Sequence, residues 1–225
     1  MKSLAAKALV GFAARILLIA FFLFIPAGSL DFWQGWVVLV LFVSCQLPTI
    51  IYFLVKDPSL IQRRLKSGAK AETRPHQKIS IELIKISAVS LFVTAGFDHR
   101  FDWSHVPISL MIIADCGLII GLFIQFRTFK ENSFASAVIT ILPEQRLIAT
   151  GPYAVVRHPM YLGALIVNFS TPIALGSWWA MWFALLWLGA IGLRVLDEER
   201  LLCESLPGYE DYRRNVRHRL LPGIW

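Results

Sequence analysis

Two polar segments of this chain carry residues that could do chemistry, and each lies at the edge of a long apolar run. Residues 151–163 read Gly-Pro-Tyr-Ala-Val-Val-Arg-His-Pro-Met-Tyr-Leu-Gly, and residues 194–199 read Arg-Val-Leu-Asp-Glu-Glu. A helix start offers free backbone N–H groups to an anion, and an arginine with a nearby carboxylate can hold further charges. We therefore expect the two segments to form the halves of one cofactor site.

The first segment has the features of a helix start. Pro159 suits the first helical position because its φ is fixed and it has no N–H to leave unpaired. His158 and Tyr161 are three residues apart, so they project from one face of the helix. Gly163 allows another helix to approach closely. The alternative is a simple proline-capped helix start, in which Arg157 serves only as a positive charge that sets membrane topology.

The second segment places Arg194 and Glu198 on one face of a helix, four residues apart. They could form an intrahelical ion pair at the membrane surface, which would contribute little. Alternatively, Arg194 holds an anionic substrate group while Glu198 meets a cationic cofactor. A single helical hairpin connects the two segments, so Tyr161 and Arg194 should reach the same membrane face.

The elements that must position these residues are membrane helices. The chain has 225 residues, of which 56% are hydrophobic, and the apolar residues gather in runs long enough to span a bilayer. We predict an all-α integral membrane protein with about six transmembrane helices. Residues 1–126 would hold four of them, and residues 127–225 would form the catalytic region of connector, hairpin and tail. The expected spans are residues 8–26, 33–55, 79–97, 106–126, 158–175 and 178–196.

Several polar residues interrupt this pattern. Arg15 lies in the first span and could reach back to the surface or pair inside the bundle. Asp115 lies near the middle of the fourth span and should face protein or be neutral. Asp57-Pro58-Ser59 predicts the start of a surface helix in the basic loop of residues 56–78. A polar turn is expected at residues 98–105.

The charge pattern gives the orientation. The formal net charge is +7, yet the basic residues lie in loops between apolar spans, so we exclude a nucleic-acid partner in favour of the positive-inside rule. Of 22 Lys and Arg residues, only Arg100 falls in a loop on the far side. Both termini and the site are therefore expected to face the cytosol, at the plasma or inner membrane of a bacterium or the endoplasmic reticulum of a eukaryote. The three cysteines have no metal-ligand spacing.

A longer pattern in the last 90 or so residues resembles a known family. It comprises Gly-Pro-Tyr-x₃-Arg-His-Pro-x-Tyr-x-Gly at residues 151–163, Arg194-x₃-Glu198-Glu199, then Gly208-Tyr209-Glu-Asp-Tyr212 and residues 216–222. This order of motifs resembles the isoprenylcysteine carboxyl methyltransferases, which are membrane enzymes that use S-adenosylmethionine. The first 130 residues share with that family only a bundle of spans.

The resemblance implies roles for individual residues. Arg194 would hold the acceptor carboxylate, and Glu198 would contact the cofactor from the same helix. Gln145 and Arg146 depart from the family's pattern, so their contacts are expected to come from the main chain. The implied S-adenosylmethionine site, which would release S-adenosylhomocysteine, consists of Gln145, Arg146, Leu147, Ile148, Tyr153, His158, Pro159, Met160, Tyr161 and Glu198.

The acceptor stays open at this point. A carboxylate is already ionised at neutral pH and needs no base, whereas an amine or thiol would need one, with His158 or Glu198 as candidates. The acceptor could be an isoprenylcysteine carboxylate, a phospholipid amine or a small thiol. Two readings from other classes also stay open, a membrane reductase that binds NADPH and resembles sterol reductases, and a non-catalytic membrane scaffold. The oligomeric state is not predicted.

Overall fold

The structure is a computed structural model that describes residues 2–65, 72, 75–135 and 145–225. Its described part is helical and contains no strand. Part of the predicted basic loop lies outside the described residues, including Lys66, Lys70 and Arg74. Residues 136–144 of the predicted connector also lie outside them. The elements are α1 (Lys2–Ala27), α2 (Trp33–Lys56), α3 (Pro58–Leu65), α4 (Pro75–Phe101), α5 (Ile108–Glu131), the short 3-10 helix η2 (Gly151–Ala154), α6 (Pro159–Ala174), α7 (Met181–Ser205) and α8 (Tyr209–Asn215).

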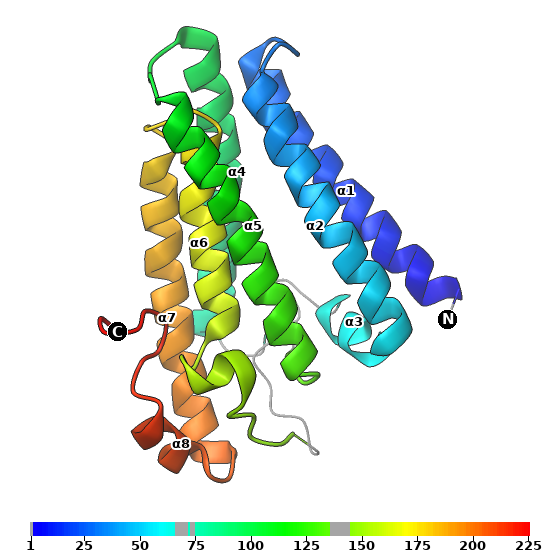
Figure 1. Cartoon of the computed structure of the whole chain (residues 1–225), viewed down its shortest axis with the longest axis vertical. Helices are drawn as coiled ribbons and strands as arrows, with labels where there is room; N and C mark the ends of the chain where they lie inside the picture. The colour runs from blue at the N-terminus through cyan, green and yellow to red at the C-terminus, as the bar shows by residue number, and fades with distance from the viewer. Residues whose placement is uncertain (1, 66–71, 73–74, 136–144) are drawn as a thin grey trace.

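The long helices form a bundle in which neighbours along the chain do not always pack together (Figure 1). α6 packs along α5, α7 packs along α4, and α1 contacts both α2 and α4. Leu23, Phe32, Leu118 and Leu175 come from α1, the α1–α2 turn, α5 and the end of α6, and they share one buried apolar core. In the view of Figure 1, α8 and the C-terminal tail lie at the lower end of α7.

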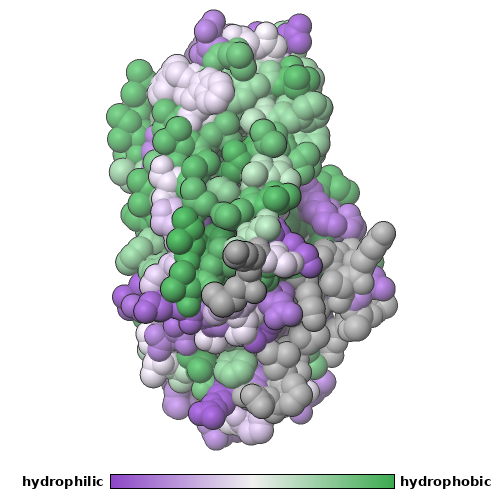
Figure 2. Space-filling view, turned by 90° about the vertical axis from the view of Figure 1, so that its right-hand side faces the viewer, coloured by the Kyte–Doolittle hydropathy of each residue, from purple (hydrophilic) through white to green (hydrophobic). Residues whose placement is uncertain are grey.

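The predicted class, an all-α integral membrane protein, is confirmed. Within the described residues, four helices are long and apolar enough to cross a membrane, namely Ser3–Ala27, Trp33–Lys56, His76–Phe101 and Ile108–Glu131. A broad hydrophobic band with hydrophilic residues at both ends is visible on the face shown in Figure 2, as expected for side chains that face lipid. α6 has only 16 residues and α7 carries charges in its second half, so the count of six spans stays a prediction.

α5 and α6 approach each other at two glycines. A Cβ atom on Gly163 would lie 2.6 Å from the carbonyl oxygen of Gly121, and a Cβ on Gly121 would lie equally close to the oxygen of Gly163. Such contact needs residues without side chains, as at many membrane helix interfaces. The predicted role of Gly163 in close helix packing is confirmed. α5 crosses the predicted domain boundary at residues 126/127, and that division stays a prediction.

The polar turn at residues 98–105 differs from expectation, because α4 continues through Phe101. Asp98 is 2% exposed, and its Oδ2 accepts hydrogen bonds from the hydroxyls of Ser104, at 2.7 Å, and Ser177. These bonds hold the buried carboxylate inside the last turns of α4 and join the α4–α5 and α6–α7 connections. The predicted helix start at residues 57–59 is confirmed, since Asp57 Oδ1 accepts the N–H of Leu60 at 3.0 Å.

Candidate active site

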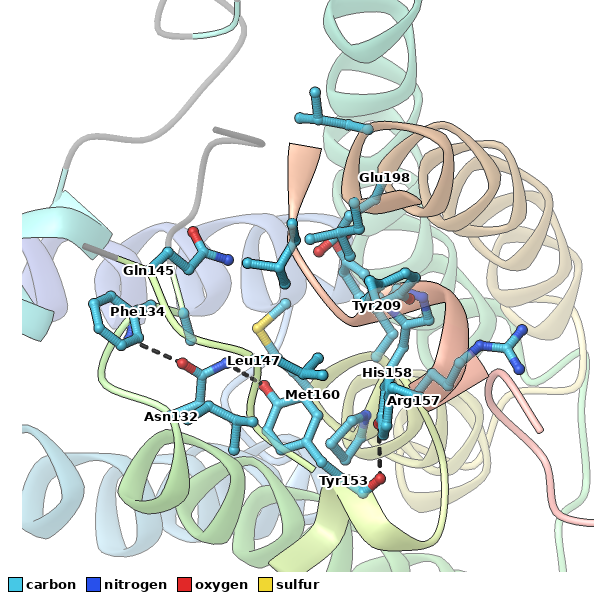
Figure 3. Close-up of a pocket in the computed structure, with 18 of the residues that line it drawn as sticks. Asn132, Phe134, Gln145, Leu147, Tyr153, Arg157, His158, Met160, Glu198 and Tyr209 are labelled. Carbon is cyan, nitrogen blue, oxygen red and sulfur yellow. Dashed lines mark hydrogen bonds between the residues drawn. The ribbon is translucent and has the colours of Figure 1, made fainter. Parts of the chain in front are cut away.

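A cleft with an empty volume of about 890 Å³ lies where the start of α6 meets the polar end of α7. Figure 3 shows side chains entering it from several segments, including Asn132 after α5, Leu147 before η2, Tyr153 of η2 and Met160 of α6. The structure brings every predicted site residue to this cleft. Those lining residues are Gln145, Arg146, Leu147, Ile148, Tyr153, His158, Pro159, Met160, Tyr161, Arg194 and Glu198.

α6 begins as the sequence predicts. Pro159 is its first residue, and His158 occupies the cap position without capping the helix through its side chain. The first N–H that donates within the helix is that of Leu162, to the carbonyl oxygen of His158 at 3.0 Å. The N–H groups of Met160 and Tyr161 are therefore not used inside α6, and they lie at the positive end of the helix dipole. An anionic group in the cleft would be favoured there.

The hydroxyl of Tyr161 lies between the two charged residues of α7. Arg194 Nε donates to this hydroxyl at 3.0 Å, and the hydroxyl donates to Glu198 Oε2 at 2.9 Å. The hairpin therefore brings Tyr161 and Arg194 together as predicted, with a tyrosine hydroxyl between the arginine and the carboxylate. A hydrogen-bonded chain of this kind fixes the direction in which the carboxylate of Glu198 faces the cleft.

Arg194 also has buried partners that sequence reasoning missed. Its Nη2 lies 3.0 Å from Glu72 Oε1, and its Nη1 donates to Gln77 Oε1 at 2.9 Å. Arg194, Glu72 and Gln77 are all buried, and a buried guanidinium needs such partners to offset the cost of leaving water. Glu72 and Gln77 are more than 110 residues from Arg194 in sequence, and no motif connects them.

Glu199 turns away from the cleft and joins the tail to the start of α6. Its Oε1 accepts from Arg157 Nε at 2.5 Å, and its Oε2 accepts from Arg219 Nε at 2.7 Å. His158 Nε2 lies 3.4 Å from Oε1. Burial alone would raise the pKa of Glu199, but the hydrogen bonds from His158, Arg157 and Arg219 outweigh it and hold that pKa well below the ordinary value.

Arg157 is therefore not a surface charge, so this part of the simpler alternative was wrong, whereas its proline-led helix start is observed. The side chain of Arg157 is buried, and besides Glu199 it donates to the carbonyl oxygens of Val216 and Arg217 at 2.7 and 2.8 Å. Its backbone N–H bonds to the oxygen of His218 at 2.9 Å. The C-terminal tail is held against the site by these contacts, which gives a structural reason for residues 216–222 in the motif.

One wall of the cleft is aromatic and apolar. Asn132 Nδ2 donates to the hydroxyl of Tyr153 at 2.9 Å, and the hydroxyl of Tyr212 donates to the backbone oxygen of Tyr153 at 2.7 Å. Burial raises the pKa of Tyr153 to about 12, so its hydroxyl stays neutral.

The lining residues not assigned to the site from sequence are Asn132, Phe134, Ala135, Arg157, Leu201, Leu202, Leu206, Tyr209 and Tyr212. Of these, only Arg157, Tyr209 and Tyr212 stood in recognisable motifs.

Comparison with known families bears on the C-terminal half of the bundle. Residues 110–206 match the family model described as phospholipid methyltransferase. The match covers α5, α6 and α7, and so includes most of the residues around the cleft. Together with the apolar helices, this match supports a membrane methyltransferase. The matched family is related to the isoprenylcysteine carboxyl methyltransferases that the C-terminal motifs resemble.

Proposed function

We propose that the cleft binds S-adenosylmethionine and that the protein transfers its methyl group to a lipophilic acceptor. One observation carries the proposal: a helix N-terminus, a carboxylate and an aromatic and apolar wall surround a single space. S-adenosylmethionine has a carboxylate, a cationic sulfonium and a flat adenine ring, so it needs these three kinds of contact. The methyltransferase family match supports the same reading.

The residues fit the parts of the cofactor. The N–H groups of Met160 and Tyr161, which make no hydrogen bond within α6, would hold its carboxylate. Glu198 and the ring of Tyr161 would attract the positive sulfonium. Leu147 and Tyr153 would cover the adenine ring. The main chain of Gln145, Arg146 and Ile148 would complete this side of the pocket.

S-adenosylmethionine supplies a methyl group bound to a positively charged sulfur, and so needs no metal or prior activation. The work left to the protein is alignment and electrostatics. Tyr161 restrains Glu198 by a hydrogen bond of 2.9 Å, which keeps the carboxylate at the proposed sulfonium position. For an amine acceptor Glu198 is the better candidate base, because His158 lies beside the buried Glu199.

Two acceptors have specific support. The C-terminal motifs and Arg194 favour a carboxylate of the isoprenylcysteine type, which Arg194 would hold. The match to the phospholipid methyltransferase model favours a phospholipid amine. In either case the apolar chain would enter from the bilayer, and the cofactor would enter from the cytosol if the positive-inside rule sets the orientation.

The acceptor is tested by methyl transfer from S-adenosylmethionine with a radioactive methyl group, using the detergent-solubilised protein. A farnesylated cysteine with a free carboxylate is one substrate, and a phospholipid with a primary amine headgroup is the other. A carboxyl methyl ester releases methanol in base, whereas an N-methyl amine does not. Transfer to neither substrate, from protein that binds the cofactor, would reject both acceptors.

The division of labour is tested at Arg194. We expect Arg194→Ala to impair acceptor methylation and to leave S-adenosylmethionine affinity within about threefold of wild type. This change removes the guanidinium that lies 3.0 Å from the buried Glu72. Adding Glu72→Gln in the same background should therefore restore part of the lost thermal stability without restoring methylation. Equal loss of cofactor affinity and methylation in a stable double variant would contradict the assignment.

A further inference from the structure

A second cavity lies between α1, α2, α3 and α5, with an empty volume of about 1170 Å³. One face of α1 contributes Ala8, Gly11, Phe12 and Arg15, which follow the helical spacing of three and four residues. Figure 1 shows α3 beside the first turns of α1 and the last turns of α2. The cavity is thus built largely from the N-terminal helices, outside the family match at residues 110–206.

Two arginines line this cavity, and neither has a carboxylate partner within the described part of the chain. Arg15 lies inside α1, a helix apolar enough to cross a membrane. Arg64 of α3 lies with its guanidinium carbon 4.2 Å from the centre of the Phe129 ring, and its Nη1 is 3.5 Å from Met160 Sδ. A positive charge in a membrane span is costly unless an anion or water accompanies it.

The two guanidiniums also repel each other. Burial, together with the positive charge of Arg15, lowers the pKa of Arg64 to about 10. Arg64 remains charged at neutral pH, so the cavity holds two positive charges that an anion between them would neutralise. By contrast, the buried guanidiniums of Arg157 and Arg194 have Glu199 and Glu72 as partners.

The remaining lining suits a molecule with a polar head and an apolar chain. Gln46, Thr49 and Gln125 add polar groups to the two arginines. Apolar walls surround these groups and would accommodate a hydrocarbon chain, whereas a free ion would gain nothing from them. The apolar lining residues are Ala8, Phe12, Ile50, Phe53, Leu60, Ile61, Leu65, Leu122, Phe126 and Phe129.

The cavity is next to the candidate active site. Met160 lines the cleft described above and lies against Arg64 at 3.5 Å. Met160 also packs against the apolar cluster that includes Phe53, Leu60 and Phe129, and these three residues line the cavity. A ligand whose charged group lies at Arg64 is therefore separated from the cleft by one flexible methionine side chain.

We propose that this cavity binds the anionic group of a membrane amphiphile, with a phosphate or carboxylate held by Arg15 and Arg64 and its chain against the apolar walls. The amphiphile is the methyl acceptor, an assignment that rests on the proposed methyltransferase function. Its headgroup reaches the cleft past Met160. The cavity thereby adds an anion-binding subsite formed by α1 and α3 to the site at the ends of α6 and α7.

The proposal is tested by direct binding of dodecyl phosphate to the protein in an uncharged detergent. Arg15→Gln and Arg64→Gln should each raise the Kd at least about tenfold, because each removes a charge-assisted hydrogen bond. The matched control is Arg63→Gln, since Arg63 neighbours Arg64 but bonds to Ser59 instead of lining the cavity. The control should leave the Kd unchanged.

A second variant tests the cavity without changing a charge. A side chain at Gly11 meets nothing within 4 Å and would project into open space at the cavity wall. Gly11→Leu should therefore fill part of the cavity and raise the Kd for dodecyl phosphate, with thermal stability and S-adenosylmethionine affinity retained.

The outcomes separate the two proposals. Unchanged dodecyl phosphate affinity in Arg15→Gln and Gly11→Leu would overturn the cavity proposal even if the protein methylates an acceptor. Equal competition by millimolar inorganic phosphate would also overturn it, because it would show an ion site with no preference for an amphiphile. Arginine-dependent binding of dodecyl phosphate by a protein that does not bind S-adenosylmethionine would support the cavity and reject the proposed function.

Discussion

Replacing Gly163 by alanine should separate α5 from α6 and disturb the cleft. The added Cβ would lie 2.6 Å from the backbone oxygen of Gly121, against the 3.4 Å at which ordinary contact begins, so the helices must move apart by about 0.8 Å. Gln125 would also be crowded, since its backbone N lies 3.2 Å from the same Cβ position. Backbone atoms cannot rotate away as a side chain would, so the helices themselves have to shift.

The expected cost follows from this geometry. Overpacking a well-packed interface typically costs about 1–3 kcal/mol, and alanine's better helix propensity returns up to about 1 kcal/mol. The net destabilisation should therefore be about 1–2 kcal/mol. Gly163 is one turn from Pro159 and Met160 at the start of α6, and a misplacement of about 1 Å can cost about a hundredfold in rate. Methyl transfer should fall by more than stability alone explains.

The assay is thermal unfolding in detergent, with cofactor affinity and methyl transfer measured on the same samples. Gly189→Ala is the matched control, because Gly189 lies in α7 and an added Cβ there would meet nothing within 4 Å. The stability of the Gly189→Ala variant should equal that of wild type or exceed it by up to about 1 kcal/mol. The reasoning is refuted if Gly163→Ala is as stable and active as wild type, or if Gly189→Ala loses as much stability.

Two further predictions concern buried carboxylates at opposite ends of the bundle. Glu199→Gln should destabilise the protein by about 3–5 kcal/mol at neutral pH, because it leaves Arg157 buried without its counter-charge. Because the pKa of Glu199 is lowered on folding, its contribution is present above the ordinary value of 4.5 and is lost as pH falls towards the lowered pKa. The gap in unfolding free energy between wild type and variant should thus stay constant from pH 7 to pH 5.5 and narrow below pH 4.5; a gap that widens in acid would contradict this. Asp98→Asn should cost about 1–3 kcal/mol, measured by thermal unfolding, because the amide cannot accept the hydroxyls of both Ser104 and Ser177 at one oxygen without burying an unpaired N–H group. Its cofactor affinity should match wild type, and a loss would mean that the far connections shape the cleft.

Local patterns predicted the parts of the site that one hairpin controls. Pro159 begins α6, and Tyr161 meets Arg194, because a proline-led helix start and an antiparallel return leave little choice. The interior glycine Gly163 also predicted a close helix contact correctly.

Contacts between distant segments could not be read in this way. Glu198 and Glu199 are adjacent glutamates, and only the structure shows which way each side chain points. Glu198 points to the cleft, where it accepts from Tyr161, and Glu199 accepts from Arg157. On a helix, adjacent residues point about 100° apart, and sequence does not say which faces the site. Glu72 contacts Arg194 although 122 residues separate the two in the sequence. The end of α4 was also misplaced, since Asp98 accepts hydrogen bonds from the hydroxyls of Ser104 and of the buried Ser177, and no local pattern indicates the bond to Ser177.

The most direct test of the central claim is calorimetric titration of the solubilised protein with S-adenosylmethionine, S-adenosylhomocysteine and NADPH. We predict saturable binding of the first two at one site per chain and no binding of NADPH. Glu198→Gln should weaken S-adenosylmethionine, whose sulfonium is positive, more than the uncharged thioether of S-adenosylhomocysteine. Binding of NADPH alone would contradict the account in favour of a reductase, and binding of none of the three would favour a non-catalytic membrane protein.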